Sequence, residues 1–406
     1  MKPAKYIVAQ VGARRGYAVP AILESAGMLA RFYTDVCGNA GLGQILAAGA
    51  PFSRGLANLA ARRVPSPVTR LTRTFPLRTA LYTYREHFRS TSGIQYLRNN
   101  LTWQCELGRA AARSGFGDAT HLFSMLGELP TLILAAKRSG LRIVSEVYIL
   151  LSTERIVAEE GRLFPGWEPP SEDFDTVRRE FFSNDVLLTQ SDSFICPSDA
   201  VRDDLIFSYG VEPGCAAVVP YGVRSLFLDQ TPQPHRGRVL FVGTADLRKG
   251  IHYLAMAANK LAHRASGLEF RVAGNVSSSV SSQPICRHLN FLGRVPRDRI
   301  HEEFQTADVF VLPTLAEGSA GVTYEALAAG VPVITTKSAG SVVRDAIDGR
   351  IVPERDPDAL ADAIQEIIED RALRNRMATA ARERAQDFTW ERYGERLLSQ
   401  LQKVPN

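Results

Sequence analysis

The chain has 406 residues, 45% of them hydrophobic and 22% charged, with a net charge of +5. This length exceeds one ordinary core and predicts two domains of roughly 150 to 220 residues each. The composition is typical of a soluble globular protein, and no apolar run approaches the ~20 residues that cross a bilayer.

The first residues and the cysteines bear on location and metal content. The opening MKPAKYIVAQVG turns polar too early for a secretory signal peptide, so we expect a cytoplasmic protein. The five cysteines are scattered, without the close pairs of a metal site or a disulfide framework. We therefore expect reduced thiols and no bound metal.

Positive charge is concentrated in residues 1–120, which contain sixteen lysines and arginines against five acidic residues. This asymmetry favours an anionic partner for that part of the chain, such as a lipid surface, a phosphorylated substrate or nucleic acid. A solvated basic face explains the same count equally well.

The first half of the chain predicts strands and helices in alternation. Short apolar runs are typical of buried strands, and they occur at 6–12 (YIVAQVG), 121–126 (HLFSML), 141–150 (LRIVSEVYIL) and 191–198 (SDSFICPS). Residues 18–26 predict a helix directly after the first strand.

Residues 40–113 have a different pattern, with arginine-rich helical segments interrupted by APFSRG and VPSPVTR. Apolar positions such as Leu77, Leu81 and Tyr84 lie between the arginines. Two interpretations stay open, namely surface helices that decorate a sheet and an amphipathic insertion that faces a membrane.

The second half predicts the same alternation more clearly. Its β-rich runs are separated by helical patterns, and such crossover connections produce a parallel sheet covered on both faces. The predicted strands are 238–243, 268–274, 290–293, 308–314 and 331–336, with helices at about 251–261 and after 323.

The proline-rich segment 219–238 is the best candidate for a linker between the halves. We therefore predict an α/β protein with an N-terminal domain at 1–222 and a C-terminal domain at 223–388. Two doubly wound domains leave a cleft between the carboxyl ends of their strands, where such sheets bind ligands.

The stretch PTLAEGSAGVTYEALAAGVPVIT, at 313–335, places Glu317 and Glu325 around a loop of small residues. A helix that begins near 322 or 323 and stops at Gly330 presents its amide donors to the cleft. Carboxylates repel phosphate, so the two glutamates are better suited to accepting hydrogen bonds from the hydroxyls of a sugar and a ribose. This arrangement predicts a nucleotide-sugar site.

The diphosphate of such a ligand needs cations, and FVGTADLRKGIHYL supplies Arg248 and Lys249 just before a helix. Alone, this pair is more typical of a solvated turn, but beside the glutamates we interpret it as the diphosphate site. Glu325 has a competing explanation as a charge that favours the helix dipole, although a capping box would need Ser or Thr at Val322.

Three weaker candidates remain. GARRG, at 12–16, offers backbone amides from Gly12 without a dinucleotide fingerprint. DPD, at 356–358, has the spacing of an acidic metal-binding pair but precedes a helical pattern, so N-capping is the simpler explanation. His121 is a lone histidine, and such residues are more often packed or solvated than catalytic.

Together these residues resemble a known family. EGSAGVTYEALAAGVPVITT is similar to the two-glutamate signature of the retaining glycosyltransferases of family four (glycosyl transferases group 1), which have the GT-B fold of two Rossmann-like domains facing across a cleft. The resemblance continues through FVGTADLRKG, FLGRVPRDRIHEEFQTADVFVLPT, VPYGVRSLF and FTWERYGERL, and so covers the last half of the chain well. Before residue 190 it is confined mainly to the opening strand, loop and helix.

The resemblance implies roles for the matching positions. Glu317 would contact the donor sugar, Glu325 the ribose and Lys249 the diphosphate, and His121 falls roughly where the family carries an acceptor-domain histidine. A terminal helix at 389–406 would pack back on the first domain. The remaining positions expected around the ligands are Gly12, Gly243, Thr244, Gly293, Arg294, Val295, Gly318, Ser319, Ala320, Gly321, Val322 and Thr323.

Two departures from the family pattern matter. Thr244 stands where the family has an arginine, so Arg248 would supply the second positive charge. Ser319 and Ala320 replace the usual aromatic residue and glycine, which leaves the shape of the sugar pocket open.

The sequence therefore predicts a retaining, metal-independent hexosyltransferase that uses a nucleoside-diphosphate sugar and no other cofactor. The expected acceptor is a glycan or lipid-linked hydroxyl of cell-surface or exopolysaccharide synthesis, reached from the inner face of an anionic membrane; nucleic acid is not expected. No residue is a clear general base. The alternatives are a sugar-nucleotide epimerase on a similar fold and a basic protein that binds lipid or nucleic acid.

Overall fold

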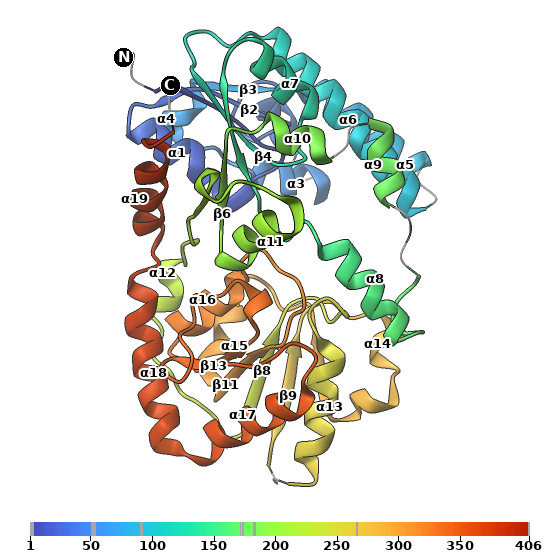
Figure 1. Cartoon of the computed structure of the whole chain (residues 1–406), viewed down its shortest axis with the longest axis vertical. Coiled ribbons are helices and arrows are strands. Elements are labelled where there is room, and N and C mark those ends of the chain that lie inside the picture. Colours follow the sequence, from blue (N-terminus) through green and yellow to red (C-terminus); the bar gives the residue numbers. More distant parts are fainter. Residues whose placement is uncertain are drawn as a thin grey trace.

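Both halves of the chain form a parallel sheet covered by helices (Figure 1). The computed structural model describes residues 4–49, 54–89, 92–170, 172, 174–181, 184–264 and 267–404. We call the layers around the first sheet the N-terminal domain and those around the second sheet the C-terminal domain. The predicted α/β class with two doubly wound domains is confirmed.

The first sheet has seven strands in the order β3-β2-β1-β4-β5-β6-β7. Strand order reverses between β1 and β4, so the loops that follow these two strands flank the switch point where open parallel sheets bind ligands. The strands are β1 (Tyr6–Ala9), β2 (Leu29–Thr34), β3 (Thr72–Thr74), β4 (His121–Met125), β5 (Arg142–Glu146), β6 (Ser193–Cys196) and β7 (Ala216–Val218).

The second sheet has six strands in the order β10-β9-β8-β11-β12-β13. Its switch point lies between β8 and β11, so the two motifs that the sequence analysis selected follow these neighbouring strands. The strands are β8 (Arg238–Val242), β9 (Glu269–Ala273), β10 (Leu289–Gly293), β11 (Val309–Leu312), β12 (Val333–Thr335) and β13 (Gly349–Ile351).

Helices cover both faces of each sheet, as crossover connections require (Figure 1). In the first part of the chain they are α1 (Ala18–Ser25), α2 (Gly43–Ala47), α3 (Arg54–Ala61), α4 (Ser66–Thr69), α5 (Pro76–Arg89), α6 (Gly93–Arg113), α7 (Pro130–Arg138), α8 (Thr153–Leu163), α9 (Phe174–Phe181), α10 (Asn184–Gln190) and α11 (Asp199–Tyr209). In the second part they are α12 (Ser225–Leu228), α13 (Ile251–Ala262), α14 (Ser278–Ser281), α15 (Ile300–Thr306), α16 (Gly321–Ala328), α17 (Pro357–Glu369), α18 (Arg371–Gln386) and α19 (Trp390–Leu401).

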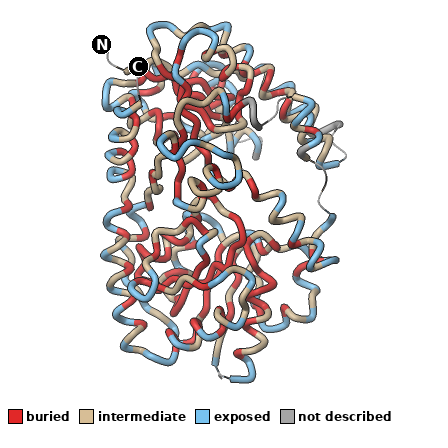
Figure 2. The backbone as a smooth tube through the Cα atoms, viewed as in Figure 1, coloured by how far each residue is buried: buried red, intermediate tan, exposed pale blue. Residues whose placement is uncertain are grey.

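Each domain has its own apolar interior, visible as separate buried zones in Figure 2. The terminal helix α19 belongs to the interior of the N-terminal domain, although α18, which precedes it, packs on the C-terminal domain (Figure 1). Tyr393 and Leu397 are fully buried there, and the Tyr6 hydroxyl donates a hydrogen bond to the Leu401 carbonyl at 2.9 Å. Helix α19 therefore packs on the domain that contains β1.

A second crossing joins the domains between β5 and α9. We call residues 147–170 the interdomain strap; its helix α8 runs down the right of Figure 1 toward the lower domain. Glu160 is fully buried and accepts hydrogen bonds from His252 Nε2 at 2.8 Å and from the Tyr253 hydroxyl at 2.5 Å. Trp167 is buried within the interior of the C-terminal domain. The sequence analysis did not predict this strap.

Some predictions for single elements are confirmed, and some elements were missed. Asp356 accepts from the amides of Asp358 and Ala359, which confirms the predicted N-cap of α17. Residues 40–113 are largely helical, but they also contain the edge strand β3, which the arginine-rich pattern concealed. Strands β2, β7 and β13 were also missed. No helix within the described residues is both long enough and apolar enough to span a membrane.

Candidate functional site

The glutamate loop, residues 313–320, connects β11 to α16 at the switch point of the second sheet. The helix begins at Gly321, slightly earlier than predicted, so Glu325 lies in its second turn rather than its first. Ala320 is the N-cap and supplies no side-chain acceptor. The first amides of α16 are therefore left for the backbone, solvent or a ligand.

The basic turn, residues 243–250, connects β8 to α13 and packs directly on the glutamate loop. The Thr314 hydroxyl donates to the Arg248 carbonyl at 2.9 Å. Gly250 has a φ of +72°, and a Cβ there would lie 2.0 Å from the Pro313 carbonyl oxygen. Only glycine permits this approach, which fixes the two segments against each other.

Glu317, Arg248 and Lys249 form one ion cluster across these segments. Lys249 Nζ lies 2.5 Å from one carboxylate oxygen of Glu317, and Arg248 Nη1 bonds to the other oxygen. Burial raises the pKa of Glu317, but the two cations outweigh that effect and hold it below its ordinary value. Burial also lowers the pKa of Lys249, against the attraction of Glu317. The three predicted residues thus meet, with the carboxylate neutralising part of the cationic charge.

A cavity of about 390 Å³ opens beside this cluster in the C-terminal domain, and we call it the C-terminal cavity. The predicted residues that line it are Gly243, Thr244, Arg294, Val295, Gly321, Val322 and Glu325. The lining residues that the sequence analysis missed as site residues are Arg224, Val242, Ala273, Gly274, Asn275, Arg297 and Ile300. The missed arginines lie in VPYGVRSLF and FLGRVPRDR, which were quoted for the resemblance but not examined as ligand contacts.

Among the residues that the structure describes, Glu325 is the only carboxylate that lines this cavity, where three arginines also lie. Burial raises its pKa to about 7, although Arg224 and Arg297 act in the opposite direction. The nearest atoms of Arg224 and Glu325 are 3.9 Å apart, too far for a hydrogen bond. Glu325 is therefore free of a strong internal partner near neutral pH, unlike Glu317.

Other predicted positions support the site from behind. The Ser319 hydroxyl donates to the Gly340 carbonyl at 2.8 Å, and the Thr323 hydroxyl donates to the Ala320 carbonyl at 2.7 Å. Thr323 is fully buried, so it stabilises the helix start rather than facing a ligand. The Gly293 carbonyl accepts from the Gly274 amide at 2.8 Å, which joins two strand ends at the cavity.

Gly318 is where the glutamate loop meets the N-terminal domain. A Cβ at this position would lie 1.7 Å from the Tyr148 carbonyl oxygen, so the strap packs on the bare backbone. The Ser198 hydroxyl, at the start of α11, donates to the Gly318 carbonyl at 2.6 Å in a buried environment. The predicted role of Gly318 thus acquires a second, interdomain component.

The loop after β1, whose backbone amides were predicted to approach a ligand, bonds within the protein instead. Arg14 pairs with Glu128, and Arg15 pairs with Glu146. They diverge because Arg15 has a φ of +48°, in the left-handed region. The Gly12 amide, expected to face a ligand, donates to a side-chain oxygen of Asp35 at 2.9 Å. The sequence analysis overlooked Glu128, just after β4, and Glu146, at the end of β5, as the acidic partners of these arginines.

A second cavity, of about 490 Å³, lies in the N-terminal domain beside the strap, and we call it the N-terminal cavity. It adjoins the glutamate loop because Tyr148 belongs both to its lining and to the contact with Gly318. Its lining consists of Val11, Arg14, Leu97, Asn100, Leu101, Gln104, Leu126, Gly127, Glu128, Val147, Tyr148, Ile149, Leu150, Leu151, Thr153, Glu154 and Arg178.

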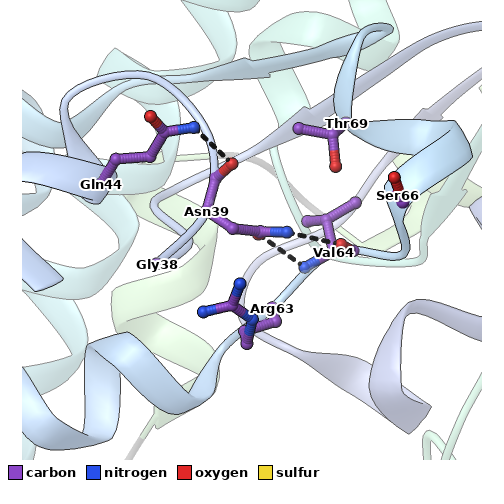
Figure 3. A pocket seen from close by; sticks show the side chains of 7 residues that line it. All are labelled: Gly38, Asn39, Gln44, Arg63, Val64, Ser66 and Thr69. Atoms are coloured by element: carbon purple, nitrogen blue, oxygen red, sulfur yellow. Dashed lines mark hydrogen bonds between the residues drawn. The ribbon is translucent and has the colours of Figure 1, made fainter.

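A shallower hollow of about 490 Å³ lies between α2 and α4 (Figure 3). Asn39 lines the hollow, and its side-chain amide is already bonded within the protein. It donates a hydrogen bond to the Val64 carbonyl and accepts one from the Val64 amide. Gln44 donates to the Asn39 carbonyl at 2.7 Å. The hollow is built from residues 38–69, whereas the glutamate loop is contacted from residues 148 and 198.

His121 is not part of the site. It is the first residue of β4, at the amino end of the strand, whereas the switch point lies at the carboxyl ends. Its ring is fully buried, stacks on Tyr6 with centroids 4.6 Å apart, and lies within hydrogen-bonding distance of Thr120. The structure therefore places His121 away from the strand ends that flank the cavities, and the catalytic role that the resemblance implied for it stays a prediction.

Comparisons with known proteins agree with this geometry. Residues 229–384 match the family described as glycosyl transferases group 1. Glycogen synthase of Mycobacterium tuberculosis is 26% identical over 317 residues, which cover 72% of this chain and 73% of the relative. Phosphatidyl-myo-inositol mannosyltransferase of Mycolicibacterium smegmatis is 33% identical over 187 residues, 43% of this chain and 48% of the relative. Anabaena HepE, solved in complex with UDP, has a TM-score of 0.63 at 15% identity, covering 98% of this chain and 99% of that one.

The contact at Gly318 gives a structural prediction. In Gly318→Ala the added methyl group must displace the Tyr148 carbonyl, so we expect the domain contact to open and the free energy of unfolding to fall by about 1–3 kcal/mol. Hydrogen–deuterium exchange should accelerate at residues 147–151 and 196–200, while the second sheet keeps its protection.

The matched control is Gly161→Ala, on the same strap, where an added Cβ meets nothing within 4 Å. It should leave exchange at both segments unchanged. Wild-type protection in Gly318→Ala would show that the strap does not rest on this glycine.

Proposed function

Because the chain is a glycosyltransferase with the GT-B fold, we propose that it moves a sugar from a nucleoside-diphosphate sugar to an acceptor hydroxyl with retention of configuration. One observation carries the proposal, namely that Glu317 holds Arg248 and Lys249 at the switch point of the second sheet, beside a cavity lined by Glu325. Anabaena HepE, solved with UDP, supports a uridine nucleotide as the first ligand to test.

In this proposal the nucleoside occupies the C-terminal cavity. Glu325 accepts hydrogen bonds from the ribose hydroxyls, since it is the carboxylate of the cavity and has no strong internal partner. Gly293, Arg294 and Val295 lie at the end of β10, where the base would rest. The diphosphate then extends toward the basic turn and the first amides of α16.

The chemical step develops negative charge on the oxygen that leaves with the diphosphate. Lys249 and Arg248 stabilise this charge in a partly buried site, where such interactions are strong. They supply charge that a metal ion provides in other enzymes, so the proposed reaction is metal-independent and uses no further cofactor. Glu317, released from one cation as the diphosphate binds, is then placed to accept from the donor sugar.

The first prediction tests Glu317. In Glu317→Gln, Arg248 and Lys249 lose their internal counter-charge, so UDP should bind at least as tightly as to the wild type. Sugar transfer should nevertheless fall by about 100-fold or more, because the interaction with the reacting sugar is lost. Calorimetry with UDP and an assay of UDP release from a panel of UDP-, GDP- and ADP-sugars measure the two effects.

Glu302→Gln is the control, since Glu302 lies in an exposed ion pair with Arg299 on the same domain. Retained transfer in Glu317→Gln would refute the proposed role. The same panel without acceptor separates the alternative enzyme class, because an epimerase converts the donor alone, whereas we expect only slow hydrolysis.

The second prediction concerns pH. Burial raises the pKa of Glu325 to about 7, so the carboxylate is ionised above that pH and protonated below it. The ionised form accepts both ribose hydroxyls, so UDP affinity should be constant above about pH 8 and fall several-fold between pH 7 and pH 5.5. The titration of UDP itself contributes equally to the variant Glu325→Gln, which should bind more weakly at pH 8 and show a smaller pH dependence. Parallel curves for the two proteins would exclude Glu325 as the titrating group.

We propose further that the enzyme works on a glycan or lipid-linked acceptor at an anionic membrane surface, as a peripheral cytoplasmic protein of polysaccharide synthesis. Exposed apolar side chains support this placement. Leu77, Leu81 and Tyr84 are 77%, 44% and 58% exposed at helical spacing along α5, and Ile45 on α2 is 70% exposed. Arginines in the same region supply the positive charge that anionic lipids attract.

Vesicle co-sedimentation tests this placement. The wild type should bind vesicles with 30% phosphatidylglycerol and not pure phosphatidylcholine, and Leu77→Asp with Tyr84→Asp should weaken binding by about tenfold or more. Phe207→Asp, at an 82% exposed site on α11, should not change it. Equal loss in both proteins, or binding of duplex DNA with the same affinity as the vesicles, would contradict a dedicated lipid surface.

A further inference from the structure

The N-terminal cavity has a composition that its neighbours do not share. Eight of its seventeen lining residues have aliphatic side chains, and these come from four separate segments of the N-terminal domain. They are Val11, Leu97, Leu101, Leu126, Val147, Ile149, Leu150 and Leu151. The C-terminal cavity, by contrast, is lined by three arginines and a glutamate.

The charged residues of the N-terminal cavity neutralise one another. Arg14 pairs with Glu128 at one place, and Arg178 forms two hydrogen bonds with Glu154 at another, one of them at 2.6 Å. No cationic side chain in the lining is left without an acidic partner, so the cavity offers little to a phosphate or a carboxylate.

The amide side chains of the N-terminal cavity are also hydrogen-bonded within the protein. Gln104 accepts from the Leu129 amide at 3.1 Å and donates to Asn100 at 2.8 Å, and Asn100 donates to the Tyr82 hydroxyl at 3.2 Å. This chain of hydrogen bonds fixes the wall formed by α6. It leaves few free polar groups for recognising a large hydrated glycan.

One donor remains. The Nε of Arg14 is buried and has no hydrogen-bond partner among the described residues, while its guanidinium lies over the Tyr148 ring at 4.5 Å. A hydroxyl of a ligand would satisfy it. Tyr148 is also the residue whose carbonyl packs on Gly318, so this polar corner is the part of the cavity next to the glutamate loop.

We infer that the N-terminal cavity binds an acceptor that is an uncharged amphiphile, a hydroxyl compound with a compact aliphatic group. The hydroxyl lies at the Arg14 corner, near the transferred sugar, and the aliphatic group lies against α6 and the strap. With about 490 Å³, the cavity has room for a sugar and a short chain, and the rest of a longer lipid would lie outside it. This inference rests on the proposed function and narrows its acceptor class away from sugars that carry a phosphate.

The test is a binding series in the presence of saturating UDP. The probes are methyl, butyl, hexyl and decyl glucosides, each below its micelle concentration, together with glucose 6-phosphate. Affinity should rise by up to about fourfold for each methylene from methyl to hexyl, then level off before decyl, because further methylenes lie outside the cavity. Glucose 6-phosphate should bind no better than the methyl glucoside.

Leu97→Ser and Ile149→Ser, at partly exposed positions of the wall, should each flatten the series. Leu163→Ser is the matched control, since Leu163 is 59% exposed at the end of the strap helix and outside the lining. It should keep the wild-type slope.

A flat series in the wild type, an unchanged slope in both wall variants, or tighter binding of the phosphate would overturn the inference. UDP binding, measured on the same samples, distinguishes failure of the acceptor inference from failure of the proposed function. If UDP binds and the series is flat, the acceptor class is wrong and the donor assignment stands. If UDP and the other nucleotides fail to bind, the proposed function itself falls.

Discussion

The contact of the Tyr148 carbonyl with the backbone of Gly318 is the constraint on which the site depends. A side chain at Gly318 would collide with it, so the two domains meet through bare backbone at this point. One residue before it, Glu317 holds both cations of the basic turn. The glutamate loop therefore positions the ion cluster of the C-terminal domain and also contacts the N-terminal domain. A movement of one domain relative to the other would change the positions of Glu317, Arg248 and Lys249.

The electrostatics of the cluster explain how this site gathers positive charge although Thr244 stands where the resembling family has an arginine. Two cations share one carboxylate, so the basic turn keeps a net positive charge and Glu317 stays ionised despite its burial. Further positive charge comes from Arg224, Arg294 and Arg297, which line the cavity from the linker and from the segment after β10. The positive charge that is missing at Thr244, just after β8, is thus supplied by arginines of other segments. Comparing the motif around Thr244 alone does not reveal these arginines.

The parts of the site that could be predicted from sequence are those with local physical causes. Glycine-rich turns after apolar runs place the basic turn and the glutamate loop, and parallel topology brings them together because β8 and β11 are neighbours. The Thr323 hydroxyl is buried and bonds to the Ala320 carbonyl, which spacing alone does not encode, and the predicted place of this residue at the ligand stays a prediction. His121 lies at the amino end of β4, and the sequence around a lone residue does not tell which end of a strand faces the cleft.

The interdomain strap was not predictable for a related reason, and it changes how the two cavities are coupled. The alternation of polar and apolar residues in the strap is no stronger than that of a surface helix. Glu160 and Trp167 are nevertheless buried in the C-terminal domain. Near its other end, Glu168 accepts from the Leu247 amide in the basic turn at 2.6 Å. The strap therefore touches the basic turn and the glutamate loop while residues 147–151, 153 and 154 line the N-terminal cavity. Any closure of the cleft that moves the C-terminal domain also moves this wall against α6, so the shape of one cavity depends on the position of the domain that contains the other.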